Sequence, residues 1–270
     1  MESKLILLGT GTPNPDIDRT GPSIAIAVTG SVYIIDFGTG VVRRAVQAGF
    51  DITKLTRAFL THLHSDHTIG YPDLIFTPGV AGRMEPLEVY GPHGLTNMTN
   101  HIMAAYEADV NERVSGLEPA EMSSYIVNTH EIAEGRIYQD NRIEVEAFRV
   151  NHGSLEAYGF RFVTPDRTYV ISGDTSPSQN LIEVAKGCDV LIHEVYSAVG
   201  LENRPEAWQK YHSAVHTSSY ELAGIANQVK PGLLIMYHQL LWGRTETDLL
   251  SEVSDLYSGK IVSGHDLDVY

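Results

Sequence analysis

The run from His62 to His67 constrains this chain more than any other feature, because His62, His64, Asp66 and His67 place four metal-binding side chains within six residues. Imidazoles and carboxylates are preferred ligands of zinc and related divalent ions. Only 12 histidines occur in 270 residues, so three in one hexapeptide are a dense concentration. The apolar run 57–60 predicts a short buried strand, and the hexapeptide then predicts a strand-to-helix loop that binds metal. A polar loop with helix-capping residues is the alternative interpretation.

One such run supplies at most four ligands, so further ligands must come from elsewhere in the chain. Three candidates follow predicted strands: His152 after 142–150, Asp174 after 169–171 and His238 after 233–236. Each of them alone is more typical of a hydrogen-bonded structural residue than of a ligand. Together, and in this order after the histidine-rich run, they form a pattern that indicates a metal centre.

The remaining patterns predict one domain, residues 1–270, of the α/β (α+β) class, in which sheets are covered by helices. Strands are predicted at 4–8, 23–28, 31–36, 57–60, 87–90, 142–150, 158–163, 169–172, 190–192 and 233–236, and helices at 41–48, 95–108, 181–185, 217–229 and 247–256. Residues 110–124 are predicted to be irregular. Strict alternation in 142–150 predicts that Ile143, Val145, Ala147 and Arg149 lie on one side of their strand. Thr217 or Ser218 is the predicted N-cap of the helix that follows.

Composition restricts the partners and the compartment. The formal net charge is −15, with 34 acidic and 19 basic residues, which argues against a broad basic surface for nucleic acid, although solubility explains the acidity equally well. The single cysteine, Cys188, excludes an intrachain disulfide and is predicted to be buried. No apolar run is long enough to span a bilayer, and the N-terminus lacks the features of a signal peptide. We therefore expect a cytoplasmic protein, although a chain trimmed of its signal would look identical.

The complete ligand pattern resembles that of the metallo-β-lactamase superfamily, and the resemblance runs the whole length of the chain. It implies a four-layer αββα sandwich with the metal site at one edge of the sheets. Within the superfamily the chain is most similar to the ribonuclease Z branch and its arylsulfatase-like relatives. The residues that carry this narrower resemblance are Gly9-Thr10-Gly11-Thr12-Pro13, His193-Glu194-Val195-Tyr196-Ser197 and His216-Thr217-Ser218.

The resemblance implies a site with two metal ions, which we expect to be zinc, with manganese or iron as other possibilities. One ion would be held by His62, His64 and His152, the other by Asp66, His67 and His238, and Asp174 would bridge them. Two such ions lower the pKa of a shared water to about 7, so that a metal-bound hydroxide attacks the substrate. The carboxylate of Asp66 would also orient that hydroxide.

Glu194 and His216 would form a catalytic dyad by the same resemblance, with His216 giving a proton to the departing oxygen. Alternatively, His216 caps the start of a helix and Glu194 supports a metal ligand. His193 is predicted to be structural or to support a ligand. The other histidines match no ligand position and receive no role: His93, His101, His130, His212 and His265.

Two departures from the family pattern bear on the substrate. Bacterial members that process transfer RNA insert a long arm between the ligands matching His152 and Asp174, which here lie only 22 positions apart. Those members also carry a phenylalanine, a serine and a nearby arginine after the last histidine ligand, where this chain has the run 239–244. In that run Trp242 and Arg244 are the predicted substrate contacts, and Trp242 is equally well interpreted as a core residue.

These observations predict a dinuclear zinc hydrolase that cleaves a small ester, with phosphodiesters and aryl sulfates as leading classes. A second hypothesis is a 3′-processing endoribonuclease that acts on precursor transfer RNA, and a third is a lactonase or carboxylic esterase. A metal-binding module without activity is the non-enzymatic alternative. We expect a small-molecule ester as partner, neither transfer RNA nor a membrane, and a homodimer as in relatives.

Overall fold

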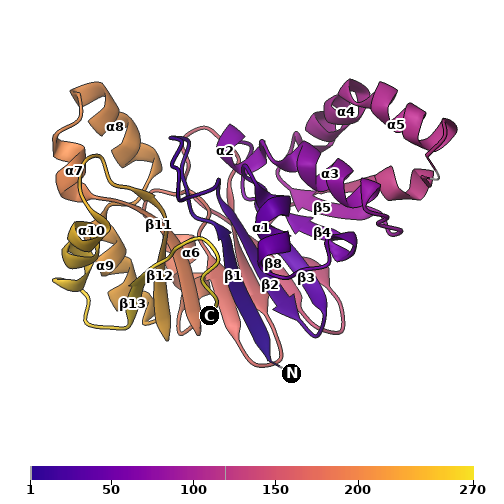
Figure 1. Ribbon diagram of the computed structural model, residues 1–270. Coiled ribbons are helices and arrows are strands. Elements are labelled where there is room, and N and C mark those ends of the chain that lie inside the picture. The colour runs from indigo at the N-terminus through magenta and orange to yellow at the C-terminus, as the bar shows by residue number, and fades with distance from the viewer. Residues whose placement is uncertain (1, 119) are drawn as a thin grey trace. The chain divides into compact units, whose positions relative to one another are not determined.

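The computed structural model describes residues 2–118 and 120–270, which form two compact units with one mixed sheet each (Figure 1). We call N-terminal unit the residues 4–9, 13–132 and 266–270, and C-terminal unit mainly the residues 133–265. The prediction that residues 1–270 act as one domain stays a prediction. No helix in the described part of the chain is both long enough and apolar enough to cross a membrane.

The N-terminal unit contains a six-stranded sheet. Its strands follow the order of the chain: β1 (Ser3–Gly9), β2 (Ser23–Val28), β3 (Ser31–Ile35), β4 (Arg57–Phe59), β5 (Leu87–Gly91) and β6 (Val127–Glu131). The predicted hairpin between β2 and β3 is confirmed, with Thr29 and Gly30 at φ 48° and 79° in the tight turn. Strands β3 to β6 are parallel, so their carboxyl ends lie at one edge of the sheet.

The helices of the N-terminal unit are α1 (Val41–Gln47), α2 (Ser65–Thr68), α3 (Tyr71–Val80), α4 (Leu95–Ala105) and α5 (Glu107–Ser115), with 3₁₀ turns at Ile52–Lys54 and Met122–Tyr125. The prediction of an irregular segment at 110–124 is wrong over its first part, because α5 extends to Ser115. Val110 is the only buried residue of this helix, which left little apolar periodicity to detect. Instead, Glu107 and Asp109 complement the helix dipole, and Arg113 pairs with Asp109 at 3.0 Å.

The C-terminal unit contains a seven-stranded sheet of order β13-β12-β11-β10-β9-β8-β7. The strands are β7 (Gly135–Gln139), β8 (Glu144–Arg149), β9 (Tyr158–Val163), β10 (Thr168–Ile171), β11 (Val190–Tyr196), β12 (Leu233–Leu240) and β13 (Ile261–Ser263). Strands β7 to β10 pair antiparallel and β10 to β13 pair parallel. Strands β8, β10, β11 and β12 therefore run in the same direction, and their carboxyl ends reach the same edge of the sheet.

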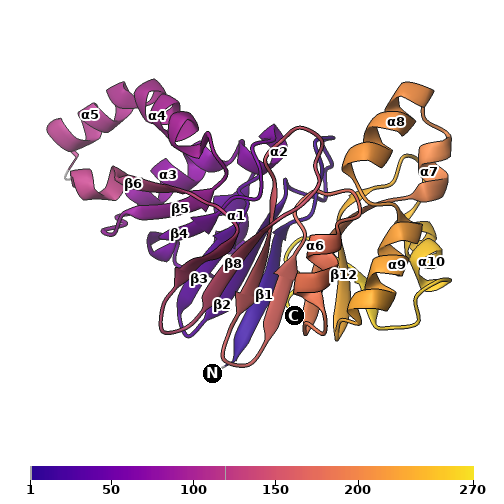
Figure 2. The ribbon, with the colours of Figure 1, turned by 180° about the vertical axis from the view of Figure 1, so that it is seen from behind.

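The helices of this unit are α6 (Gln179–Ala185), α7 (Ala198–Glu202), α8 (Glu206–Val215), α9 (Ser219–Val229) and α10 (Glu246–Ser254). Figure 2 shows α6 and α9 together along the C-terminal sheet, where their apolar sides join one core cluster. Ser218 is confirmed as the N-cap of α9, and with Glu221 it forms a capping box. Helices α7 and α8 were not predicted from the sequence.

Burial in β8 does not follow the two sides of the strand. Val145 and Ala147 are buried, but Arg149, at the next alternate position, is exposed, and Phe148 is buried. Phe148 packs with Leu181 and Ile182 of α6, which covers the second face of the strand at this end. A strand that is covered on both faces loses the simple period of two.

Candidate metal centre

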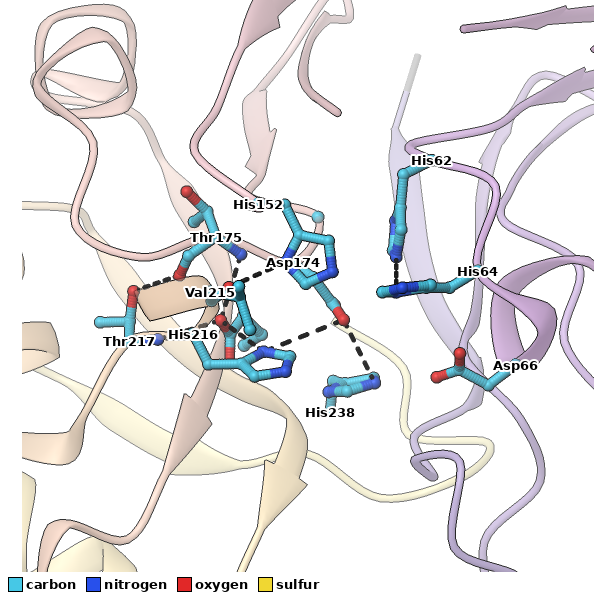
Figure 3. Close-up of polar contacts among 12 residues, drawn as sticks. His62, His64, Asp66, His152, Asp174, Thr175, Val215, His216, Thr217 and His238 are labelled. Atoms are coloured by element: carbon cyan, nitrogen blue, oxygen red, sulfur yellow. Dashed lines mark hydrogen bonds and ion pairs between the residues drawn. The ribbon is translucent and has the colours of Figure 1, made fainter. Parts of the chain in front are cut away.

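Four predicted ligands, His62, His64, Asp66 and His67, lie on the loop after β4 and in the first turn of α2, and we call them the N-terminal ligand set. Nε2 of His62 lies 3.0 Å from Nδ1 of His64, so two imidazole nitrogens converge (Figure 3). Glycines allow the loop to pack closely. A Cβ on Gly38 would lie 2.6 Å from the carbonyl oxygen of Asp66, and a Cβ on Gly70 would lie 2.2 Å from that of Gly38.

Asp36 orients this set, and our sequence reasoning missed it. Its carboxylate is buried directly after β3, in a left-handed backbone conformation with φ 57°. Nδ1 of His67 donates to Oδ2 of Asp36 at 2.8 Å. The Thr61 hydroxyl donates to the same carboxylate at 2.9 Å and accepts from Nδ1 of His62 at 3.0 Å. His62 and His67 therefore keep Nε2 as the nitrogen that can bind metal, which is the usual support of a histidine ligand. The signal was an acidic residue at the end of a buried strand.

The other three predicted ligands, His152, Asp174 and His238, form the C-terminal ligand set at the common edge of β8, β10 and β12. Nδ1 of His152 donates to the carbonyl of Val215 at 2.8 Å, which leaves Nε2 as the ligand nitrogen. Ligand atoms of His152 and Asp174 lie within 4.8 Å of each other. Nε2 of His238 lies 3.6 Å from Oδ2 of Asp174 (Figure 3).

His238 lies inside β12 rather than after it, because the strand runs to Leu240 and not to the predicted end at Met236. Tyr237 pairs with Glu194, whereas Gln239 pairs with the next residue, Val195, so His238 is the extra residue of a β-bulge. Its φ of 47° lies in the left-handed region, which is uncommon for residues other than glycine. A bulge redirects one side chain out of the regular alternation, and here it redirects a predicted ligand.

Glu194 and His216 are in direct contact, as the predicted dyad requires. Nδ1 of His216 donates to Oε1 of Glu194 at 3.2 Å, and the same oxygen accepts from the backbone N–H groups of Thr175 at 3.1 Å and Thr217 at 3.0 Å. Burial, followed by the nearby charge of Asp174, raises the pKa of Glu194 well above its usual range. The alternative that His216 caps α9 is wrong, since Ser218 fills that position.

His193 lies beside the dyad and is fully buried. Its Nδ1 donates to the carbonyl of Glu194 at 2.6 Å, and burial lowers the pKa of His193 to about 4. The imidazole is therefore neutral near pH 7. These contacts agree with the predicted structural role.

The two predicted substrate contacts lie in different surroundings. Trp242 is half-buried, with its ring 4.5 Å from that of His212 and 5.5 Å from that of Tyr196. The guanidinium of Arg244 pairs with Asp248 of α10 at 3.2 Å and lines a pocket of about 520 Å³. Both substrate contacts stay predictions. Four histidines without a predicted role bind acidic or carbonyl partners at the surface: His93, His101, His130 and His265.

The donor chemistry of both sets fits a divalent metal ion. Every side chain is an imidazole or a carboxylate, and the buried thiol of Cys188 is not among them. In each set, at least one histidine has its Nδ1 proton engaged by a fixed acceptor, as histidine ligands of metals require. Two ring nitrogens 3.0 Å apart, as in His62 and His64, also suit a shared cation.

Solved structures show the fold class. The chain matches the metallo-β-lactamase fold protein YhfI from Bacillus subtilis with a TM-score of 0.79 and 17% identity, over 99% of this chain and 98% of that one. It matches the short form of human tRNase Z with a TM-score of 0.75 and 20% identity, again over 99% and 98% of the two chains. These matches confirm the predicted fold of the metallo-β-lactamase type.

Sequence comparison identifies the family. The chain is 30% identical to ribonuclease Z of Mycobacterium marinum over 271 residues, which cover 98% of this chain and 96% of that protein. With the clusters of side chains that could hold a metal, this relationship defines a metal-dependent hydrolase of the metallo-β-lactamase fold, related to ribonuclease Z. The family model for the anti-Pycsar protein Apyc1 matches residues 3–246, and the chain belongs to this family. The predicted resemblance to the ribonuclease Z branch is confirmed.

Proposed function

We propose that this protein is a dinuclear metal hydrolase that cleaves the phosphodiester bond of a small molecule. In this proposal the two ligand sets act on one pair of ions, with zinc as the expected metal. The proposal assigns His62, His64 and His152 to the first ion and Asp66, His67 and His238 to the second, and Asp174 would serve as a ligand of both. Sites of this kind clamp the attacking and the leaving oxygen of a displacement.

The observation that carries the proposal is the orientation of the histidines. Asp36 holds Nδ1 of His67 and, through Thr61, that of His62, while the carbonyl of Val215 holds Nδ1 of His152. Three imidazoles from the two sets are thus fixed in the tautomer that leaves Nε2 to bind metal. A purely structural histidine needs no such uniform arrangement.

Divalent ions bound there would supply a Lewis acid for the phosphate and an activated water. The protein's own groups complete the chemistry. In this proposal the carboxylate of Asp66 orients the attacking water. Glu194 holds Nδ1 of His216, so the imidazole can deliver a proton from Nε2 to the leaving oxygen.

A compact phosphodiester is favoured over the other esters by three facts. The names of the matched relatives, ribonuclease Z and tRNase Z, refer to enzymes that act on RNA, whose linkage is a phosphodiester. The net charge of −15 opposes binding of a long polyanion. Between His152 and Asp174 the chain forms only the β9–β10 hairpin. The smallest nucleotide with this linkage is a cyclic mononucleotide, which we infer as the first natural substrate class to test.

Processing of precursor transfer RNA remains the second candidate, and one observation favours it. The match to the mycobacterial ribonuclease Z covers 96% of that protein, so this relative has no long arm that the present chain lacks. We nevertheless expect weak binding of transfer RNA with a shallow dependence on salt, because few phosphates would be neutralised. Tight binding with a steep salt slope would favour the endoribonuclease.

The test is a substrate panel for zinc-loaded protein: cyclic mononucleotides, bis(p-nitrophenyl) phosphate, p-nitrophenyl sulfate, a lactone and a precursor transfer RNA. We expect turnover of the first two and little of the others. His67→Ala should abolish this turnover, whereas His265→Ala, at a surface histidine paired with Glu246, should retain it. Preferential hydrolysis of the sulfate, the lactone or the transfer RNA would contradict the proposal.

A further inference from the structure

The imidazole of His212, on α8, lies in an aromatic cluster that neither the fold nor the proposed function explains. Its ring centroid lies 4.5 Å from that of Trp242, 5.6 Å from that of Trp208 and 5.6 Å from that of His216. Trp208 is 48% exposed, so the cluster reaches from the predicted proton donor to the protein surface.

One of the two ring nitrogens of His212, Nδ1, is unsatisfied. The residue is only 9% exposed, and its Nδ1 is buried without a hydrogen-bond partner among the described residues. Burial is the main reason that the pKa of His212 falls to about 4, and His216 and Arg204 lower it further. The imidazole is therefore neutral near pH 7 and offers one donor and one acceptor. Leaving a buried donor or acceptor unpaired is unfavourable, which points to a partner supplied by a ligand.

The chain holds this cluster at a defined distance from the dyad. His212 and His216 lie one helical turn apart, and the backbone N–H of His216 donates to the carbonyl of His212 at 2.9 Å. Both ends of the α7–α8 segment are anchored by the buried carboxylate of Glu252, which accepts from the hydroxyl of Ser197 at 2.6 Å and from that of Ser219 at 2.5 Å. A side chain carried by such a segment is preorganised for recognition.

We propose that His212 is a specificity-determining residue that hydrogen-bonds the heteroaromatic ring of the substrate, next to the flanking rings of Trp208 and Trp242. A nucleobase has the required chemistry, because it offers a flat π-face for aromatic contact and ring atoms that donate and accept hydrogen bonds. This inference rests on the proposed function, since the base would belong to the ester whose leaving oxygen His216 protonates.

The chain itself supplies the reporter for a binding test. It contains two tryptophans, and both lie in contact with the ring of His212. We expect titration of the zinc-loaded protein with adenosine or cytidine 5′-monophosphate to change the tryptophan emission. His212→Phe should weaken this binding about 3- to 10-fold, the usual effect of one lost hydrogen bond. His212→Asn, which retains a donor and an acceptor, should recover part of the affinity. Ribose 5-phosphate, which has no base, should bind wild type and His212→Phe equally.

Kinetics should show the same selectivity. His212→Phe should raise the KM for cyclic mononucleotides about 3- to 10-fold, as for binding, with kcat little changed. The KM and kcat for bis(p-nitrophenyl) phosphate should stay unchanged. Tyr211→Phe, on the same helix and 43% exposed, is the matched control and should behave as wild type.

Two results would overturn the inference: an equal loss for nucleoside monophosphate and ribose 5-phosphate, which indicates a structural role, or unchanged affinity for both. Failure of the proposed function is a separate outcome. If the wild type hydrolyses no phosphodiester, the fluorescence titration still decides whether His212 binds a base.

Discussion

The two ligand sets differ in how the chain assembles them. The N-terminal set places four predicted ligands within six residues, whereas the C-terminal set takes three predicted ligands from residues 152 to 238, at the ends of β8 and β10 and at a bulge in β12. A contiguous set depends on one local conformation. A dispersed set depends on the register of a whole sheet, because one displaced strand moves its ligand away from the others.

The groups that orient the ligands differ in the same way. In the N-terminal unit the side chain of Asp36 holds His67 and, through Thr61, His62. In the C-terminal unit the backbone carbonyl of Val215 holds His152, and backbone N–H groups hold Glu194. A single substitution can therefore remove the support of the first set, while the support of the second persists as long as the backbone is folded.

The largest effect is expected from Asp174→Ala. In the proposed function this carboxylate would be a ligand of both ions, so its removal should abolish activity and lower the metal content from the expected two equivalents. The loss should exceed the roughly 10–100-fold cost of removing an outer partner of a ligand. Elemental analysis and turnover are the measurements, and Asp255→Ala, an exposed residue after α10, is the control. Retention of both ions would show that Asp174 does not bridge.

His216→Ala separates the dyad from the ligands of the C-terminal unit. A positioned general acid contributes roughly 10²–10⁴-fold, so alkyl phosphodiesters should slow by about that factor. Nitrophenyl esters should slow much less, because nitrophenolate departs without a proton. Metal content should stay unchanged. An equal loss on both leaving groups would reject proton donation, and loss of metal would place His216 among the ligands.

Asp36→Asn tests the difference in orienting groups. Replacing this carboxylate should lower metal affinity by roughly 10–100-fold, because two histidines lose their oriented support together. Val215→Ala should leave metal affinity near that of the wild type, since the carbonyl that holds His152 is retained. Competition with a metal chelator measures both. Glu131→Gln, which removes a carboxylate bonded to His93, is the control in the same unit. Equal losses in Asp36→Asn and Val215→Ala would contradict the comparison.

The smallest expected effect is a loss of folding stability at acid pH. Unfolding at acid pH should begin in the C-terminal unit. Burial lowers the pKa of His193 from 6.5 to about 4, so below pH 6.5 the unfolded chain binds the proton more readily than the folded one. The free energy of unfolding is therefore not reduced by this histidine above about pH 6.5. It falls as the pH drops toward 4, by at most roughly 3 kcal/mol.

Urea unfolding of metal-free protein between pH 7 and pH 4 measures this loss. His193→Asn keeps a donor for the carbonyl of Glu194 and should show a smaller decline than the wild type. Hydrogen exchange should increase in β11 before it increases around residues 62–67. An identical pH dependence of the two proteins would show that His193 does not carry the effect.

Local patterns predicted much of both units. The hairpin of β2 and β3, the cap at Ser218 and the approximate positions of most strands follow from turn chemistry, capping and apolar periodicity, which act over a few residues. Helix α5 and the α7–α8 segment were missed because their buried residues are few and dispersed. The burial of Phe148 was not predicted, because it depends on a distant helix, α6, that covers the second face of β8.

The sequence by itself determined the identity of the candidate ligands, because imidazoles and carboxylates are recognisable wherever the chain carries them, and four of them stand in one hexapeptide. Only the tertiary structure decided which groups orient them. Asp36 lies 31 positions before His67, and Val215 lies 63 positions after His152, so neither hydrogen bond has a local signature. The bulge at His238 and the buried imidazole of His212 likewise depend on strand pairing and packing between distant segments, which no short window of sequence contains.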